Sequence, residues 1–213
     1  MLLPMSLLLA FARIAWRVAL CFVIADLLVG TVHWFEDCYG SPEWPLIGAT
    51  VIAPNLLHHA RPRAFLDNTW WKSADLQVIA GAAVLTLAWL AGWFSAELLL
   101  VVALAVNANE FHRWAHRTRA ENGRMISALQ ACRLVQTRAH HGRHHGGARN
   151  SCYCAITSWM DPLLDSLRVW RGLEWLVWRV TGVRPRVDPA VAARMDAVRM
   201  DAVRMVRQAP QRA

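Results

Sequence analysis

The chain contains little lysine and tyrosine, and its cysteines follow no familiar spacing. Among 213 residues there are one lysine and two tyrosines, so arginine carries almost all of the positive charge behind a net charge of +8. The cysteines are odd in number and lack the spacing of a zinc ribbon or a disulfide framework, which indicates small buried hydrophobes instead: Cys21, Cys38, Cys132, Cys152 and Cys154. The motif H-E-x-x-H is also absent, which argues against a zinc hydrolase of that type.

Apolar residues, by contrast, are abundant. The chain is 56% hydrophobic, has twelve tryptophans and a mean hydropathy of +0.25, which is too apolar for a typical soluble domain. A basic balance alone could indicate nucleic acid, a membrane surface or anionic substrates. Bilayer-length apolar segments favour the membrane and argue against nucleic-acid binding. We therefore expect an all-α integral membrane protein.

The apolar pattern predicts about three transmembrane helices. Residues 14–34 form the first, because no signal-peptide cleavage site follows the apolar residues 1–12; Arg17 is expected to reach towards the headgroups. Residues 76–94 form the second, and residues 98–106 begin a third after a tight turn at 92–97. Residues 40–62 read as a loop or short helical turns. Segments 117–138 and 163–181 are expected to be interfacial helices. Residues 1–187 are predicted to be one domain, followed by a low-complexity tail, residues 188–213.

Nine histidines fall into four tight groups, and neutral imidazole is the commonest metal ligand. A hairpin starting near residue 75 would return the third group to the side of the membrane where the others lie. In a helical fourth group, residues four apart share one face and could converge on an ion. A tract that merely scavenges metal would be contiguous, so we favour one shared site built from His33; His58 and His59; His112 and His116; and His140, His141, His144 and His145.

Two carboxylates share a predicted helix face with His33. Asp26, Gly30, His33 and Asp37 are spaced four, three and four residues apart. Asp37 is predicted to be a metal ligand or the partner of a ligand histidine. Asp26 could be a functional intramembrane group or a structural pair with another helix, and the sequence leaves both open.

So many imidazoles exceed what one ion needs, because a zinc site takes three or four protein ligands. Two ions fit better, and imidazole-rich paired sites suit non-haem iron. The H-x-x-H-H spacing is familiar from membrane desaturases and hydroxylases, in which paired iron activates O2. The candidate metal-binding and catalytic residues are Asp37 and the nine histidines, and no pattern singles out a histidine that lies behind the others.

Four motifs carry a resemblance to a known family. They are Asp26-x3-Gly30-x2-His33-Trp34-x2-Asp37-x2-Gly40; His58-His59-x2-Pro62; His112-x3-His116; and His140-His141-x2-His144-His145 followed by Cys154-x-Ile156-Thr157-x-Trp159 and Gly182-x2-Pro185-Arg186. Over residues 26–188 the chain resembles the plasmanylethanolamine desaturase family, which also includes a plastid enzyme acting on phosphatidylglycerol.

The resemblance implies two iron ions, O2 and an electron donor such as cytochrome b5 or a ferredoxin system. The implied reaction introduces a vinyl-ether double bond into an O-alkyl glycerophospholipid and forms a plasmalogen. The Trp-Trp-Lys stretch after Asn68 departs from the family and leaves the choice of lipid open.

Two other functions compete with this one. A hydroxylase, or a desaturase of an ester-linked acyl chain, would use the same residues. A membrane metal sensor or carrier is less favoured, because residues 76–106 contain no histidine or cysteine that could pass an ion across the bilayer.

Arginine distribution predicts an orientation and a substrate contact. Most arginines lie on the histidine side, so the positive-inside rule places that face in the cytoplasm, at the inner membrane if the source is bacterial; Arg13 and Arg17 fall on the other side.

Arginine binds phosphate bidentately, so Arg138, Arg143 and Arg149 are candidates for holding a lipid phosphate; plain interfacial charge is the alternative.

Overall fold

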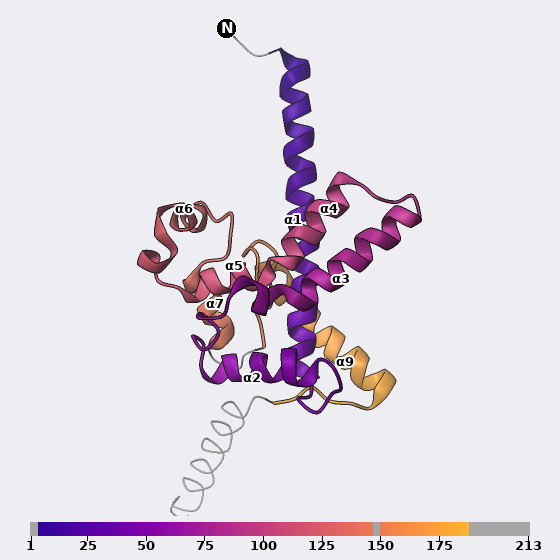
Figure 1. Ribbon diagram of the computed structural model, residues 1–213, viewed down its shortest axis with the longest axis vertical. Coiled ribbons are helices and arrows are strands. Elements are labelled where there is room, and N and C mark those ends of the chain that lie inside the picture. The colour runs from indigo at the N-terminus through magenta and orange to yellow at the C-terminus, as the bar shows by residue number, and fades with distance from the viewer. Residues whose placement is uncertain (1–3, 147–149, 188–213) are drawn as a thin grey trace, which may run out of the picture.

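The computed structural model describes residues 4–146 and 150–187, and throughout these ranges all regular secondary structure is helical (Figure 1). The predicted all-α class is confirmed for that part of the chain. Arg149 and the predicted tail, residues 188–213, lie outside the described residues, so the predictions made for them stay predictions.

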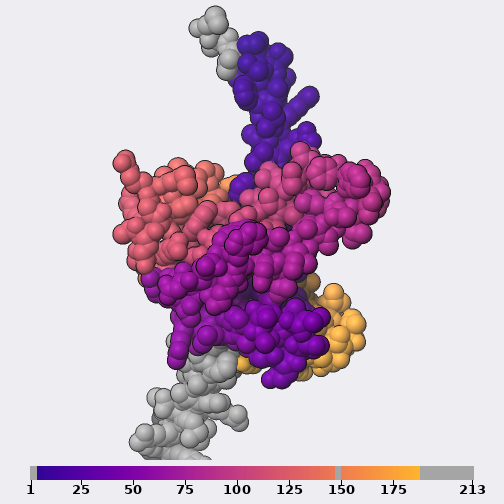
Figure 2. All heavy atoms as spheres, in the orientation of Figure 1, coloured from indigo at the N-terminus to yellow at the C-terminus, as the bar shows by residue number. Residues whose placement is uncertain are grey.

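The longest helix, α1 (Met5–Cys38), has 34 residues and runs from the top of the view to the level of α2 (Figure 1). The expected start near residue 14 was wrong, because no helix breaker separates the apolar residues before Arg13 from those after it. The N-terminal turns of α1 stand clear of the other helices (Figure 2). Arg17, which was expected to reach towards the lipid headgroups, forms an ion pair with Glu97 at the start of α4.

A hairpin of α3 (Trp70–Leu90) and α4 (Ala96–Val106) packs against α1. Thr69 and Ser95 cap the two helices, their hydroxyls accepting from Lys72 N and Leu98 N. The helix α4 ends after eleven residues, about 16 Å, because the Asn107 side chain donates to the Ala103 carbonyl and competes with the helical ladder. Within the described ranges, two helices, α1 and α3, are long and apolar enough to cross a membrane, and α4 is apolar but shorter. The prediction of about three transmembrane helices stays a prediction.

Shorter helices surround the C-terminal half of α1. They are the π-helix η1 (Gly48–Ile52), α2 (Ala53–Ala60), α5 (Ala108–His116), α6 (Arg119–Ala131), α7 (Arg138–His145), α8 (Asp161–Ser166) and α9 (Val169–Thr181). The loop or short helical turns predicted over residues 40–62 are present as turns, η1 and α2. The expected helix over 117–138 is shorter and is interrupted at Gly123 (φ 68°). The expected helix over 163–181 divides at Arg168, whose φ is 54°.

A buried loop, residues 150–160, packs between α1 and the C-terminal helices and forms the core there. Tyr153 and Cys154 pack with Trp34 and Trp170, and Ile156 packs with Val101 of α4 and neighbouring residues of α1. A Cβ added at Gly30 would lie 3.2 Å from the Cys154 sulfur. This is why the helix face that carries His33 has a glycine one turn earlier.

Candidate metal centre

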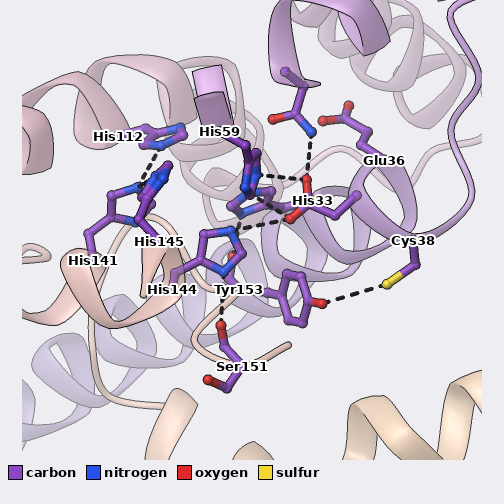
Figure 3. A network of polar contacts seen from close by, with 12 residues as sticks. His33, Glu36, Cys38, His59, His112, His141, His144, His145, Ser151 and Tyr153 are labelled. Carbon is purple, nitrogen blue, oxygen red and sulfur yellow. Dashed lines mark hydrogen bonds and ion pairs between the residues drawn. The ribbon is translucent and has the colours of Figure 1, made fainter. Parts of the chain in front are cut away.

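Two groups of ligand side chains meet at the C-terminal end of α1. The first, here called the five-histidine group, consists of His58, His112, His116, His141 and His145. The second, the Asp37 group, consists of His33, Asp37, His59 and His144. Within each group the potential ligand atoms all lie within 4.8 Å of one another. The groups adjoin, since ring centroids lie 5.4 Å apart for His58–His59 and 5.5 Å apart for His144–His145. Figure 3 shows His144 and His145 side by side.

Helical geometry distributes the histidines between the groups. His58 and His59 are consecutive on α2 and therefore point about 100° apart, one into each group. His112 and His116 on α5, and His141 and His145 on α7, are four residues apart and share a group. The fourth histidine cluster is helical, since all four of its histidines lie on α7.

The Asp37 group is arranged as a cation site. Asp37 Oδ2 lies 3.2 Å from His144 Nε2 and 3.6 Å from His33 Nε2, and Asp37 Oδ1 lies 3.1 Å from His59 Nε2. The Nδ1 atoms of His33 and His144 donate to the Tyr153 and Ser151 carbonyls, each at 2.9 Å. A neutral imidazole has one N–H, so both Nε2 lone pairs face the carboxylate and the site fits a bound cation.

Orphaned buried atoms support the same conclusion. Within the described residues, the Nε2 atoms of His33, His59 and His144 and the Oδ2 atom of Asp37 are buried without a hydrogen-bond partner. Both ring nitrogens of His58 in the five-histidine group are likewise buried without a hydrogen-bond partner. Because buried polar atoms nearly always have partners, so many orphans at one point indicate a missing ligand.

The five-histidine group brings its Nε2 atoms close together. Nε2 of His112 lies 2.8 Å from that of His141 and 3.1 Å from that of His116, and the His141–His145 distance is 3.0 Å. Burial, followed by repulsion from neighbouring imidazoles, lowers the pKa of His116 to about 3 and that of His145 to about 2. These rings are therefore neutral at neutral pH, which leaves lone pairs for a metal.

His144 differs because a carboxylate faces it. Burial alone would lower its pKa, but the adjacent Asp37 carboxylate outweighs burial and raises the pKa of His144. The two groups together offer imidazole and carboxylate and no thiolate, a donor set that suits a transition metal such as iron. Five imidazoles in one group also exceed the ligand number of a zinc site.

His140 is the one predicted ligand that lies outside both groups. Its Nε2 atom lies 2.6 Å from Asp161 Oδ2, and its Nδ1 atom contacts the Arg143 guanidinium. The other Asp161 oxygen accepts from Cys154 N at 3.1 Å. His140 and Asp161 form a third cluster with Cys152, but these hydrogen bonds occupy both carboxylate oxygens. His140 therefore ties α7 to the buried loop.

Asp26 has a structural role, one of the two that the sequence left open. It is fully buried and accepts hydrogen bonds from the backbone N–H groups of Ile156 and Thr157, at 2.9 and 3.1 Å, and from the Thr157 hydroxyl. Its partner is thus the buried loop and not another helix.

Several residues that support the centre were not predicted from the sequence. Asn55 donates to Asp37 Oδ1 at 2.6 Å. The Arg186 guanidinium donates to the carbonyls of Glu36 and Asp37, each at 2.9 Å, and so holds the last turn of α1. The motif Gly182-x2-Pro185-Arg186 was the available signal for Arg186.

Two of the three arginines proposed for phosphate binding, Arg138 and Arg143, lie on α7, and Arg149 lies outside the described residues. Arg138 and Arg143 are exposed, and Arg143 contacts His140. Their predicted role stays a prediction.

A cavity of about 510 Å³ reaches the centre from between α1, α3 and α4. His33, His58 and His112 line one end, and the remaining walls are mostly apolar side chains, including Leu28, Val32, Leu76, Val84, Leu98, Val101 and Val102. Its volume lies within the roughly 300–1,000 Å³ of small-molecule sites. The cavity can therefore present a hydrocarbon chain to the histidines; we call it the chain cavity.

Comparison with known proteins then decides the family: the lipid desaturase domain matches residues 22–188. The chain belongs to the lipid desaturase family. It is 31% identical over 175 residues to a probable fatty acid desaturase of Acanthamoeba polyphaga mimivirus, covering 80% of this chain and 85% of that one. It is 31% identical over 186 residues to plasmanylethanolamine desaturase of Myxococcus xanthus, covering 83% and 66%.

A third relative is chloroplastic fatty acid desaturase 4 of Arabidopsis thaliana, 32% identical over 171 residues, covering 78% of this chain and 52% of that one. No solved structure matches this lipid desaturase. The resemblance found in the four motifs is thus confirmed, and the chain is an oxidoreductase that desaturates lipid.

Proposed function

We propose that this lipid desaturase holds two iron ions, one in each ligand group, and forms a vinyl-ether double bond in an O-alkyl glycerophospholipid. The product is a plasmalogen. O2 and electrons from a donor such as cytochrome b5 or a ferredoxin system complete the reaction. Iron bound there would supply oxidation of an unactivated C–H bond, chemistry that no side chain provides alone.

The chain's own residues bind and orient the ligand atoms. The carbonyls of Ser151 and Tyr153 fix the ring orientation of His144 and His33 and direct their Nε2 atoms towards Asp37. Burial keeps most of the other imidazoles neutral. A preorganised, neutral ligand set needs little rearrangement to take up a metal ion.

The shape of the chain cavity is the observation that carries the choice of reaction. A vinyl ether forms between the first two carbons of the alkyl chain, next to the ether oxygen and the glycerol. The headgroup must therefore lie beside the iron, with the hydrocarbon extending away on one side. The cavity is lined by His33, His58 and His112, by polar residues including Asn68, Ser73 and Asn109, and by many apolar residues of α1, α3 and α4.

The apolar surfaces of α1 and α3 support a membrane location. In their most apolar segments, 6% and 11% of the residues are buried within the protein, whereas the core helix of a soluble protein buries its apolar face. We propose that both helices span the bilayer with the histidine face in the cytoplasm, as the arginine distribution predicts. The Arg17–Glu97 pair would then lie towards the opposite side.

A desaturase or hydroxylase of an ester-linked acyl chain is the second candidate. It is favoured by the names of two relatives, the mimivirus and Arabidopsis fatty acid desaturases. The same cavity would accept an acyl chain, provided that the reacting carbon lies deeper along the chain.

A lipid profile of cells with and without the protein, supplied with alkyl-ether phospholipid, tests the proposal. Mild acid releases an aldehyde from a vinyl ether and not from an alkyl ether, so we expect acid-labile aldehyde only when the protein is present. A new double bond in an ester-linked chain would favour the second candidate. Identical lipids in aerobic, iron-replete cells would contradict both and favour a metal sensor.

A further inference from the structure

We propose that Lys72 binds the phosphate of the lipid substrate at the mouth of the chain cavity. This inference rests on the proposed function and adds to it the residue that recognises the headgroup. Lys72 lies in the first turn of α3 and lines the cavity. Among the described residues that line the cavity, it is the single lysine or arginine.

The Lys72 ammonium is available for a ligand. Its side chain is exposed and makes no ion pair with any residue that the structure describes. Two carboxylates, Glu36 and Asp75, also line the cavity, yet neither lies within ion-pair distance of Lys72. Lysine binds phosphate as a point charge, so one phosphodiester is a suitable partner.

Hydrogen bonds fix Lys72 near the metal centre. The adjacent residue, Ser73, accepts a hydrogen bond at its carbonyl from Asn109 and one at its hydroxyl from Arg113, the latter at 2.8 Å. Both donors lie on α5, where they flank the ligand His112 in the sequence. Trp70 Nε1 also donates to Asn107 Oδ1 at 3.0 Å, so the start of α3 is attached at three points to α5 and the residue that precedes it.

This position matches the chemistry of an O-alkyl lipid. Only the glycerol backbone separates its phosphate from the ether oxygen, so a phosphate at Lys72 would place the first alkyl carbons near the His112 end of the cavity. The rest of the alkyl chain would follow the apolar walls. Two tryptophans next to Lys72, Trp70 and the exposed Trp71, are the residue type found at the headgroup level of a bilayer.

The arginines of α7 are the alternative phosphate ligands. Arg138 and Arg143 are exposed but do not line the chain cavity. A phosphate bound by them would lie outside the space that receives the hydrocarbon chain. Binding of the phosphate by Lys72 and binding by Arg138 therefore predict different effects of substituting these two residues.

The first test measures binding and needs no catalytic activity. Because the sequence has a single lysine, an amine-acylating reagent modifies Lys72 and the N-terminal amine, and the latter serves as an internal control. We expect an O-alkyl glycerophosphocholine to slow the modification of Lys72 several-fold and a phosphate-free alkyl-acyl-glycerol to leave it unchanged. Equal protection by both lipids, or by neither, would overturn the proposal even if the protein proved to act on another lipid.

The second test compares substitutions by steady-state kinetics in the intact protein. Lys72→Gln should raise KM for the phospholipid by about tenfold or more, the usual effect of losing a hydrogen bond to a charged group, and Lys72→Arg should restore much of it. On the phosphate-free lipid, Lys72→Gln and the unaltered protein should behave alike. Arg124→Gln on α6 is the matched control for loss of one exposed positive charge. A KM effect from Arg138→Gln and none from Lys72→Gln would assign the phosphate to α7.

Discussion

His140 and His144 lie one helical turn apart on α7, yet their rings meet different partners. His144 is directed at Asp37 and is completely buried, whereas His140 binds Asp161 of α8. An i,i+4 pair shares a helix face, but which residue faces the metal depends on what packs on that face. Whether a histidine of α7 can bind the metal therefore depends on the residues that pack against its ring.

We expect His144→Ala to abolish desaturation and to remove iron from the Asp37 group while leaving membrane insertion intact. The reason is that the variant lacks one of three imidazoles around Asp37. Iron per chain and vinyl-ether product are the quantities to measure. His140→Gln is the matched control, because glutamine can still donate to Asp161; it should keep its iron. Full activity in His144→Ala would refute the ligand assignment.

At the scale of elements, α1 is held at two levels by side chains that are not ligands. Asp26 binds the backbone of the buried loop near the middle of α1, and Arg186 binds the carbonyls of its last turn. Both contacts keep His33 and Asp37 in register with the carbonyls that orient the ligand rings.

Arg186→Ala should lower the free energy of unfolding by roughly 1.5–3 kcal/mol, the range for hydrogen bonds to a charged group. It should also weaken metal binding by the Asp37 group, because the last turn of α1 carries Asp37. Thermal unfolding and iron content measure the two effects. Arg184→Ala, which removes a guanidinium stacked 4.8 Å from the Trp178 ring, is the control. Equal iron content in both variants would contradict this role.

Asp26→Ala should destabilise the protein through the loop. The substitution leaves the N–H groups of Ile156 and Thr157 buried without an acceptor, at about 1–3 kcal/mol for each. Asp26→Asn keeps one carbonyl oxygen and should restore part of the stability. The midpoint of thermal unfolding distinguishes the variants. An unchanged midpoint in Asp26→Ala would show that the loop does not depend on this carboxylate.

For the whole molecule, bound metal and fold are expected to be linked. The two ligand groups draw side chains from α1, α2, α5 and α7, so one centre connects helices from distant parts of the chain. Any ligand that binds the folded state alone raises its apparent stability.

Removing metal with a chelator should therefore abolish activity and lower the midpoint of thermal unfolding. Ferrous iron should restore both, because the orphaned nitrogens of the two groups regain their partner. A double variant, His58→Ala with His144→Ala, should show no response to the chelator. An active, chelator-treated protein free of iron would contradict the metal centre.

The sequence by itself determined the helical class, two long apolar helices and the residues that are candidate ligands. Histidine spacing fixes which rings can share a helix face, and this holds for His112 with His116 and for His141 with His145 because the helical repeat is local. Spacing also indicated that Asp37 belongs with His33. Residues 98–106, predicted to begin the third span, lie within α4, but the break between α4 and α5 at Asn107 was not predicted.

Only the tertiary structure decided how ten candidate ligands divide into groups. The exclusion of His140 depends on Asp161, which is 21 residues away in the chain, and the orientation of His33 depends on the carbonyl of Tyr153, 120 residues away. Such contacts form because a buried irregular loop must satisfy its own polar groups, and its partners are set by packing in three dimensions. The spacing of residues that are close in the sequence cannot predict such long-range contacts.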